Sequence, residues 1–238
     1  MTIRAIVDFV LAQFRKIDAP TPSVQEIIQT LNDMMNAEIR AAMRMVDPDS
    51  LVLETKIQVD NGIDEIPLYK SDKYWIGDIR EVDWYNTDGE YVATLLRFDT
   101  ITSKLGWPSQ TGVPKVYSEL SNLKMRLHPN PPNDTAAGFK GYLHIAHDTL
   151  FLPVVDDALT TGLTLEKTMF GSAASANIPQ TLLGELTPYI NNLLVFKLSG
   201  NQLYYANAQS SLESVMLSHG VRVKSGLGSL NNAGGELK

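Results

Sequence analysis

The sequence contains no cysteine. This absence excludes a disulfide scaffold, a thiolate zinc site and a cysteine nucleophile, and it fits synthesis in a reducing cytoplasm. Long apolar runs are missing as well. The longest strongly apolar run, Leu193 to Phe196, has four residues, whereas a membrane-spanning helix needs about 20. Met1 to Arg4 do not begin the basic-then-apolar pattern of a signal peptide, so we expect none. Without a candidate membrane-spanning helix we also expect no membrane partner.

Clusters of lysine and arginine are also absent from the sequence. The chain has 27 acidic and 20 basic residues, a net charge of -7. Residues 47–160 hold 18 acids and 10 bases, a net of -8, whereas residues 1–46 balance at five of each. This distribution argues against tight non-specific binding to nucleic acid, which depends on neutralising phosphates. An acidic surface would repel DNA, which is useful only where DNA must pass without adhering, and the alternative is that the net charge simply keeps the protein dispersed.

Sequence motifs of the common nucleotide and serine-hydrolase sites do not occur in the chain. The one candidate for metal chemistry is His144, His147 and Asp148, because two histidines and a carboxylate can ligate zinc or another divalent ion. However, the segment has the pattern of a strand, in which residues three apart point to opposite faces. We therefore expect no catalytic residue, no metal and no cofactor, and we keep a metal-dependent hydrolase as the alternative that these three residues would support.

Residues 1–48 have the pattern of a helical hairpin. Apolar residues recur at spacings of three and four from Ile3 to Phe14 and again from Val24 to Ile39. Pro20 and Pro22 break the pattern between the two stretches. Ser23 with Glu26 three residues later has the spacing of a capping box and begins the second helix. Two amphipathic helices joined by a short turn are expected to pack antiparallel.

Residues 49–158 change to strand periodicity. Short apolar and aromatic stretches alternate with turn signals such as Asp60-Asn61-Gly62 and Thr87-Asp88-Gly89. Strands are predicted at 51–59, 63–69, 74–85, 90–98, 113–117, 123–128 and 141–146. Several short strands separated by turns indicate an antiparallel sheet or a small barrel.

Residues 159–217 contain a Gly-, Ser- and Thr-rich loop with short ordered pieces, followed by two helices that we expect to pack on residues 1–48. Pro188 predicts a kink or a break in the first of these helices. Residues 218–238 include five glycines among 21 residues and no aromatic, so a flexible tail is predicted. The apolar residues of this tail are candidate docking residues that would order on a partner: Val221, Val223, Leu227, Leu230 and Leu237.

The sequence thus predicts the α+β class. A helical bundle forms from the N- and C-terminal helices, an antiparallel β-sheet domain is inserted between them, and a flexible tail ends the chain. One bundle made from both chain ends gives each amphipathic helix an apolar partner.

Short motifs in the same order resemble a known family. After the Pro-containing turn comes Leu31-Asn32-Asp33-Met34, and residues 112–117 read Gly-Val-Pro-Lys-Val-Tyr. Residues 123–131 read Leu-Lys-Met-Arg-Leu-His-Pro-Asn-Pro, and Ile178-Pro179 precedes an apolar helix. This series is similar to the head-to-tail adaptor, or head completion, proteins of tailed bacteriophages, with departures at 51–100 and 159–177.

The resemblance implies a structural protein of the virion and no enzyme. Such proteins form a ring, typically dodecameric, that docks under the portal protein and extends the channel through which DNA passes without specific binding. The other face of the ring meets the tail nozzle or the next connector, at the neck of the particle. The alternative within the same class is another neck, tail or capsid-associated structural protein.

Overall fold

The computed structural model describes residues 1–61, 65–70, 74–98, 111–120, 124–132, 138–170 and 180–221. It is a mixed α+β structure, which confirms the predicted class. By its contacts the chain divides into two compact units. One holds Met1–Pro48 together with the chain from Gln180 onward, and the other is Asp49–Pro179. The predicted boundary after residue 48 coincides with this division, whereas the predicted boundary after 158 lies 21 residues before it.

The helical unit begins with the two predicted helices. They and the helices near the C-terminus have these bounds: α1 (Ile3–Lys16), α2 (Val24–Met34), η1 (Met35–Ile39), α3 (Arg40–Val46), α7 (Gln180–Glu185), α8 (Thr187–Ser199) and α9 (Gln202–Ser218). The apolar stripe of α1 is buried. The Ser23 hydroxyl accepts the Glu26 backbone N–H while the Glu26 carboxylate accepts the Ser23 N–H, so the predicted capping box is confirmed.

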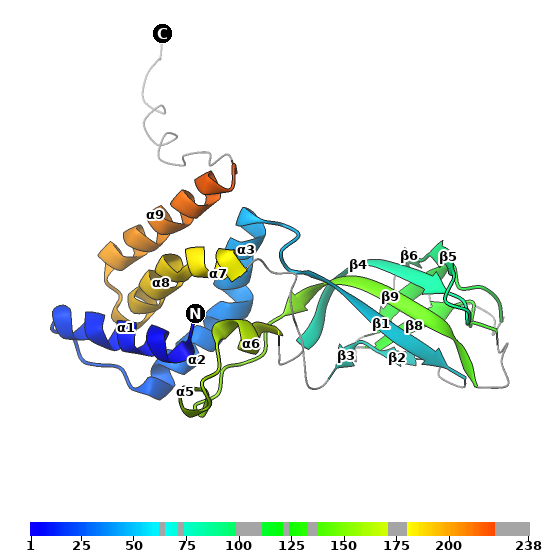
Figure 1. The fold of residues 1–238 in the computed structure, drawn as a ribbon, viewed down its shortest axis with the longest axis horizontal. Coiled ribbons are helices and arrows are strands. Elements are labelled where there is room, and N and C mark those ends of the chain that lie inside the picture. Colours follow the sequence, from blue (N-terminus) through cyan, green and yellow to red (C-terminus); the bar gives the residue numbers. More distant parts are fainter. Residues whose placement is uncertain are drawn as a thin grey trace, which may run out of the picture. The chain divides into compact units, whose positions relative to one another are not determined.

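Helices from the two chain ends contact each other in this unit. Figure 1 shows α8 beside α9 and α1, and α8 also contacts α2. Lys197 of α8 forms an ion pair with Glu38 of η1. Burial raises the pKa of Tyr189 in α8 to about 12, and the nearby Glu38 carboxylate adds to the effect. Since α8 is buried on several sides, it lacks the one-sided stripe that α1 has.

Two details of the helices differ from regular geometry. The second predicted helix does not run on as one α-helix, because a π-helical turn, η1, separates α2 from α3. The break predicted at Pro188 is confirmed: α7 ends at Glu185, and α8 restarts at Thr187 with the proline in its first turn. In the first turn of a helix no backbone N–H donates within the helix, so the absence of an N–H on Pro188 costs no hydrogen bond there.

The strand unit has two sheets. Its strands are β1 (Val52–Asp60), β2 (Glu65–Pro67), β3 (Tyr69–Lys70), β4 (Tyr74–Tyr85), β5 (Tyr91–Thr94), β6 (Leu96–Arg97), β7 (Val116–Leu120), β8 (Lys124–His128) and β9 (Phe139–Leu150). The five-stranded sheet has the order β1-β9-β4-β3, with β5 also pairing with β4. Figure 1 shows β1, β9 and β4 side by side. The four-stranded sheet has the order β2-β8-β7-β6.

The chain passes between the two sheets at two corners. Leu68 separates β2 of one sheet from β3 of the other, and Leu95 separates β5 from β6. Both leucines are buried, and they belong to a core that holds Val82, Trp84 and Leu143. The inner faces of the two sheets supply this core, as in packed β-structures where strands switch sheets at a bend.

The strand unit differs from the predicted single antiparallel sheet in two respects, because its strands form two sheets and one strand pair is parallel. Strands β6 and β7 pair in parallel, with Leu96 opposite Val116, while the other described pairs are antiparallel. Strand β6 follows the corner at Leu95 and pairs with the edge of the second sheet at β7. Two short helices, α5 (Ala158–Thr161) and α6 (Leu165–Phe170), lie in the segment predicted as a loop. In the described part of the chain, no helix is long and apolar enough to cross a membrane.

Candidate functional site

The predicted metal candidates lie on opposite faces of β9. The His147 side chain is fully buried, while His144 is half-buried and stacks on Tyr85 with ring centroids 4.0 Å apart. Two ligands on opposite faces of a strand cannot hold one ion. Among the residues that the structure describes, no group of three histidine, aspartate or glutamate side chains is arranged to bind a metal.

Each ring nitrogen of His147 has a hydrogen-bond partner. Nδ1 lies 3.0 Å from the backbone oxygen of Asp148, and Nε2 lies 2.9 Å from the Thr55 hydroxyl. A carbonyl oxygen only accepts, so Nδ1 carries the proton and Nε2 accepts from the threonine when the ring is neutral. Burial lowers the pKa of His147 to about 4. The ring is therefore neutral near pH 7, and both of its nitrogens are engaged within the fold.

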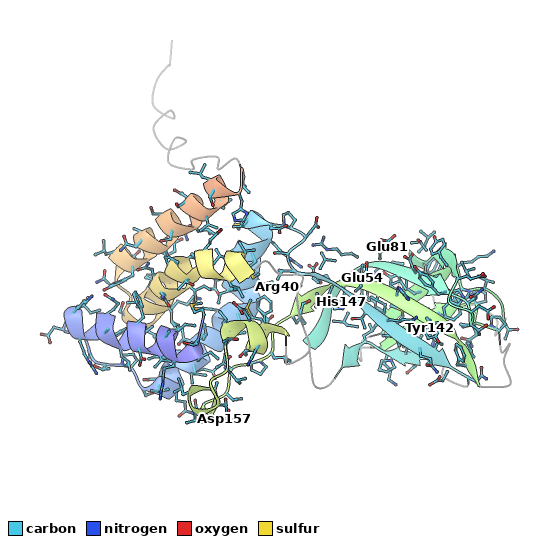
Figure 2. All side chains as sticks on the ribbon, in the orientation of Figure 1. Arg40, Glu54, Glu81, Tyr142, His147 and Asp157 are labelled. Atoms are coloured by element: carbon cyan, nitrogen blue, oxygen red, sulfur yellow. The ribbon has the colours of Figure 1, made fainter. Side chains whose placement is uncertain are left out.

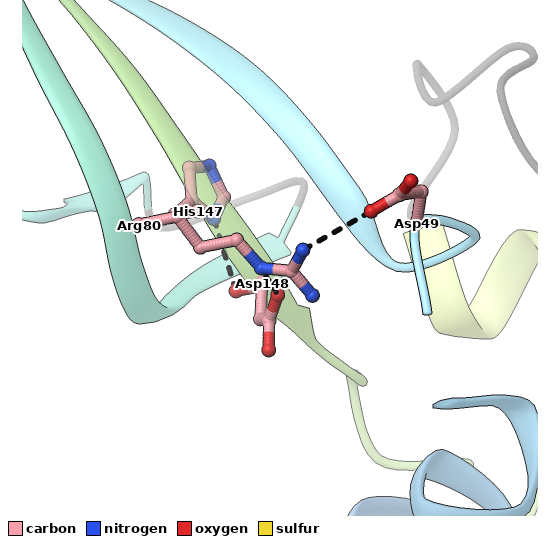
Figure 3. A network of polar contacts seen from close by, with 4 residues as sticks. All are labelled: Asp49, Arg80, His147 and Asp148. Carbon is pink, nitrogen blue, oxygen red and sulfur yellow. Dashed lines mark hydrogen bonds and ion pairs between the residues drawn. The ribbon is translucent and has the colours of Figure 1, made fainter. Parts of the chain in front are cut away.

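Asp148 forms an ion pair with an arginine (Figure 3). Arg80 Nε donates to Asp148 Oδ1 at 2.7 Å, and Arg80 Nη1 reaches Asp49 Oδ1 at 3.2 Å. The Asp148 carboxylate is buried, whereas the Asp49 carboxylate is exposed. The pairing of β4 with β9 is irregular on both sides of Ile79, and such bulges redirect side chains. The ion pair with Arg80 compensates the cost of burying the Asp148 carboxylate.

An open groove adjoins the network. Its volume is about 670 Å³, and it lies where the chain leaves β4 through β5 and β6. It is lined by Asp49, Val52, Arg80, Glu81, Thr94, Leu95, Leu96, Arg97, Tyr117 and Ala146. Arg97 lies 3.3 Å from the Glu119 carboxylate, and burial raises the pKa of Tyr117. The groove therefore offers charged rims and apolar walls for binding, with no histidine in its lining.

Aromatic side chains form a row across the outward face of the five-stranded sheet. Gln58, Tyr142, Tyr85 and Tyr91 are register partners on β1, β9, β4 and β5. The Tyr85 and Tyr91 rings meet edge to face at 5.8 Å, and Lys56 Nζ lies 4.0 Å from the centre of the Tyr142 ring. The sequence alone does not reveal this row, because strand periodicity fixes the face of each tyrosine but not which strands are neighbours.

Helix α9 exposes an uncharged stripe. Leu203, Ser210 and Leu217 lie on one side of the helix at helical spacing, with Ala206, Asn207 and Ser214 beside them, and all six are exposed. Leu203 is 64% exposed and Leu217 is 63% exposed. The 17 residues of α9 contain one charged residue, Glu213. The opposite side, with Ala208 and Leu212, is buried.

The first predicted docking residue of the tail has a local role. Gly220 adopts a left-handed conformation (φ 72°), its N–H donates to the Leu217 oxygen, and the Val221 N–H donates to the Met216 oxygen. These two bonds form a Schellman motif, which satisfies the last carbonyls of α9. Val221 therefore belongs to the end of the helix. Val223, Leu227, Leu230 and Leu237 lie outside the described residues.

Neither a scan of known protein-family models nor a search of curated proteins gives a match for this chain.

Proposed function

We propose that the chain is a virion structural protein, a head-to-tail adaptor of a tailed bacteriophage. In this proposal it docks under the portal protein as a homo-oligomeric, dodecameric ring and connects the capsid to the tail nozzle or next connector. It would act at the neck of the virion without enzymatic activity or a cofactor. The finer architecture belongs to the same proposal: a bundle of both chain ends, an inserted sheet domain and a flexible C-terminal tail.

The observation that carries the proposal is the uncharged stripe of α9. Its 17 residues span about 25 Å. Small side chains between two exposed leucines let another helix approach closely, and the one charge of α9, the exposed Glu213, lies at the edge of the stripe. A surface of this kind suits packing between copies of a chain. The Schellman motif formed by Gly220 and Val221 ends the helix that carries this stripe.

The charge distribution supports the DNA-channel role. Residues 47–160 carry a net charge of -8, and this range is largely the strand unit. A negatively charged wall repels the phosphate backbone, so DNA would slide past without specific binding. The other virion structural roles share this support, and the position of a labelled chain in the particle distinguishes them. The hydrolase alternative has less support, because the two histidines that it would use, His144 and His147, lie on opposite faces of β9.

Portal binding tests the proposal directly. Purified chain is mixed with portal rings of the phage that encodes it, and the complex is sized by light scattering coupled to gel filtration. We expect a ring-sized complex with the wild-type chain, and its loss in the Leu203→Glu/Leu217→Glu variant, which places charges on the stripe. Val155→Glu is the matched control, because Val155 is a similarly exposed apolar residue of the strand unit.

The control and the two contradicting results of the portal-binding assay can be told apart. The control should bind portal like the wild-type chain, and circular dichroism should show that all three proteins are folded. No binding of the wild-type chain to portal at any salt concentration would falsify the adaptor role. Binding that survives both glutamates would remove α9 from the interface.

A further inference from the structure

The outward face of the five-stranded sheet combines a row of tyrosine rings, of which Tyr91 is exposed, with carboxylates. We propose that this face is a docking surface for a cationic segment of another protein, an extended stretch that carries arginine or lysine at alternate positions. Burial defines the face. Val82 and Trp84 of β4 point into the core, so Glu81, Asp83 and Tyr85 point outward.

Three rows of register partners cross this face. The first is the tyrosine row of Gln58, Tyr142, Tyr85 and Tyr91. The second, two residues along each strand, is Lys56, His144, Asp83 and Thr94. The third is Glu54, Ala146 and Glu81. Figure 2 labels Glu54, Glu81 and Tyr142 on their three strands.

The charge of the rows favours a cation. The rows contain three carboxylates, those of Glu54, Glu81 and Asp83, and one lysine, Lys56. The turn from β4 to β5 adds two exposed carboxylates, Asp88 and Glu90. Arg80 lies beside the rows but is already paired with Asp148 and Asp49. Phosphate-bearing ligands would be repelled by this surface, whereas arginine and lysine side chains would be attracted.

The protein itself shows the contact that such a ligand would make. Lys56 Nζ lies 4.0 Å from the centre of the Tyr142 ring, within the range of a cation–π interaction. Tyr91, at the other end of the row, is 57% exposed, so its ring is open to a second cation. The Tyr91 hydroxyl is held 3.1 Å from the Thr94 hydroxyl, which fixes the position of the ring.

The spacing of the rows defines the pattern in the partner. Residues two apart along a strand are separated by about 6.6–6.8 Å, and so are alternate residues of an extended ligand. A segment lying parallel to the strands would therefore place successive cations over the tyrosine row, beside Asp83, and between Glu54 and Glu81. Ala146, the small residue between those glutamates, leaves room for the third cation. This inference depends on the sheet alone and does not rest on the adaptor role.

A labelled peptide of alternating arginine and serine tests the inference by fluorescence anisotropy with the full-length chain. We expect the Glu54→Gln/Glu81→Gln variant to raise the Kd about five-fold at low salt, since two exposed ion pairs are lost. We expect Tyr91→Ser to raise the Kd about three-fold through the lost cation–π contact. The matched control, Asp8→Asn/Glu213→Gln, removes the same charge from exposed sites of the helical unit.

Each outcome decides the inference. Unchanged affinity of the control, with weaker binding by both sheet variants, supports it. Equal weakening by the control shows general attraction to an acidic protein and overturns it. Binding of a neutral oligosaccharide such as cellohexaose in place of the peptide also overturns it, in favour of a sugar-stacking face. Because portal binding is a separate assay, the adaptor proposal can fail while this one stands.

Discussion

His147 is a buried titratable residue whose environment favours the neutral ring. Its pKa is lowered to about 4 from the ordinary 6.5 because the ring is buried. Above pH 6.5 the ring is neutral in both the folded and the unfolded chain, so burial carries no pH-dependent penalty there. As the pH falls from 6.5 toward 4, the unfolded chain gains a proton that the folded chain does not. The contribution of His147 to the unfolding free energy is therefore complete at neutral pH and is lost as the pH falls from 6.5 toward 4.

We expect the His147→Gln variant to show a shallower loss of stability with acid. Between pH 7 and pH 5 the unfolding free energy of the wild-type chain should fall by about 2 kcal/mol more than that of the variant. Urea denaturation at the two pH values measures both quantities. Since all other groups titrate in both proteins, equal losses would mean that His147 does not control the acid response.

Gly141 occupies a site that no side chain fits. Its φ is 150°, and an added Cβ would lie 2.4 Å from the Tyr85 backbone oxygen and 2.6 Å from the Trp84 ring. The close approach of β9 to β4 at this point aligns the tyrosine row beside it, where Tyr85 pairs with Tyr142. A backbone oxygen cannot move aside as a flexible side chain can.

Replacing this glycine should destabilise the fold. We expect Gly141→Ala to lower the unfolding free energy by about 1–3 kcal/mol, as overpacking in a core does. Gly184→Ala is the control, because nothing lies within 4 Å of its added Cβ, and alanine favours a helix. Thermal unfolding should show a lower midpoint for the first variant and an unchanged or higher one for the second.

At the scale of elements, the caps locate the helix ends. Thr2, Ser23 and Asn201 accept backbone N–H groups at the starts of α1, α2 and α9. Gly200 in the left-handed conformation ends α8. These residues act locally, so the sequence alone could indicate the capping box at Ser23 and the break at Pro188. The π-helical turn η1 has no such local signal in its five residues, Met-Asn-Ala-Glu-Ile, and was not predicted.

The capping box gives a prediction for α2. We expect Ser23→Ala to lower the unfolding free energy by about 1 kcal/mol, since the Glu26 N–H loses its acceptor. Ser210→Ala, an exposed serine inside α9, is the control and should be neutral or slightly stabilising. Chemical denaturation of the two variants measures the difference, and equal stabilities would contradict a role for the cap.

The positions and faces of the strands follow from local sequence, whereas their pairing does not. The sequence predicted β4 to the residue, because twelve residues rich in aromatic and β-branched side chains lie between turn signals. It predicted the face of His147 relative to His144, since alternation along a strand is local. It could not predict that β9 lies between β1 and β4 or that β6 pairs in parallel with β7. Those pairings join residues far apart in the chain, and turn chemistry does not encode them.

At the scale of the whole molecule, the uneven distribution of charge along the chain follows the division into two units. The excess acid lies in the range that folds mostly as the strand unit, while residues 1–46 are balanced. The two proposed surfaces follow this division, because the stripe of α9 is uncharged and the sheet face is acidic. Assembly through the stripe should therefore tolerate salt, whereas binding of a cationic segment should weaken as salt screens the carboxylates.

The sequence by itself determined the α+β class, the apolar stripes of α1 and α2, the capping box at Ser23 and the face on which each strand residue lies. These properties depend on neighbours within a few positions, where periodicity and capping chemistry act. Only the tertiary structure decided that Tyr142, Tyr85 and Tyr91 form one row, that Arg80 neutralises the buried Asp148, and that Val221 closes α9. The row and the ion pair arise from strand pairings across long stretches of chain, and the cap depends on a backbone conformation that composition does not specify.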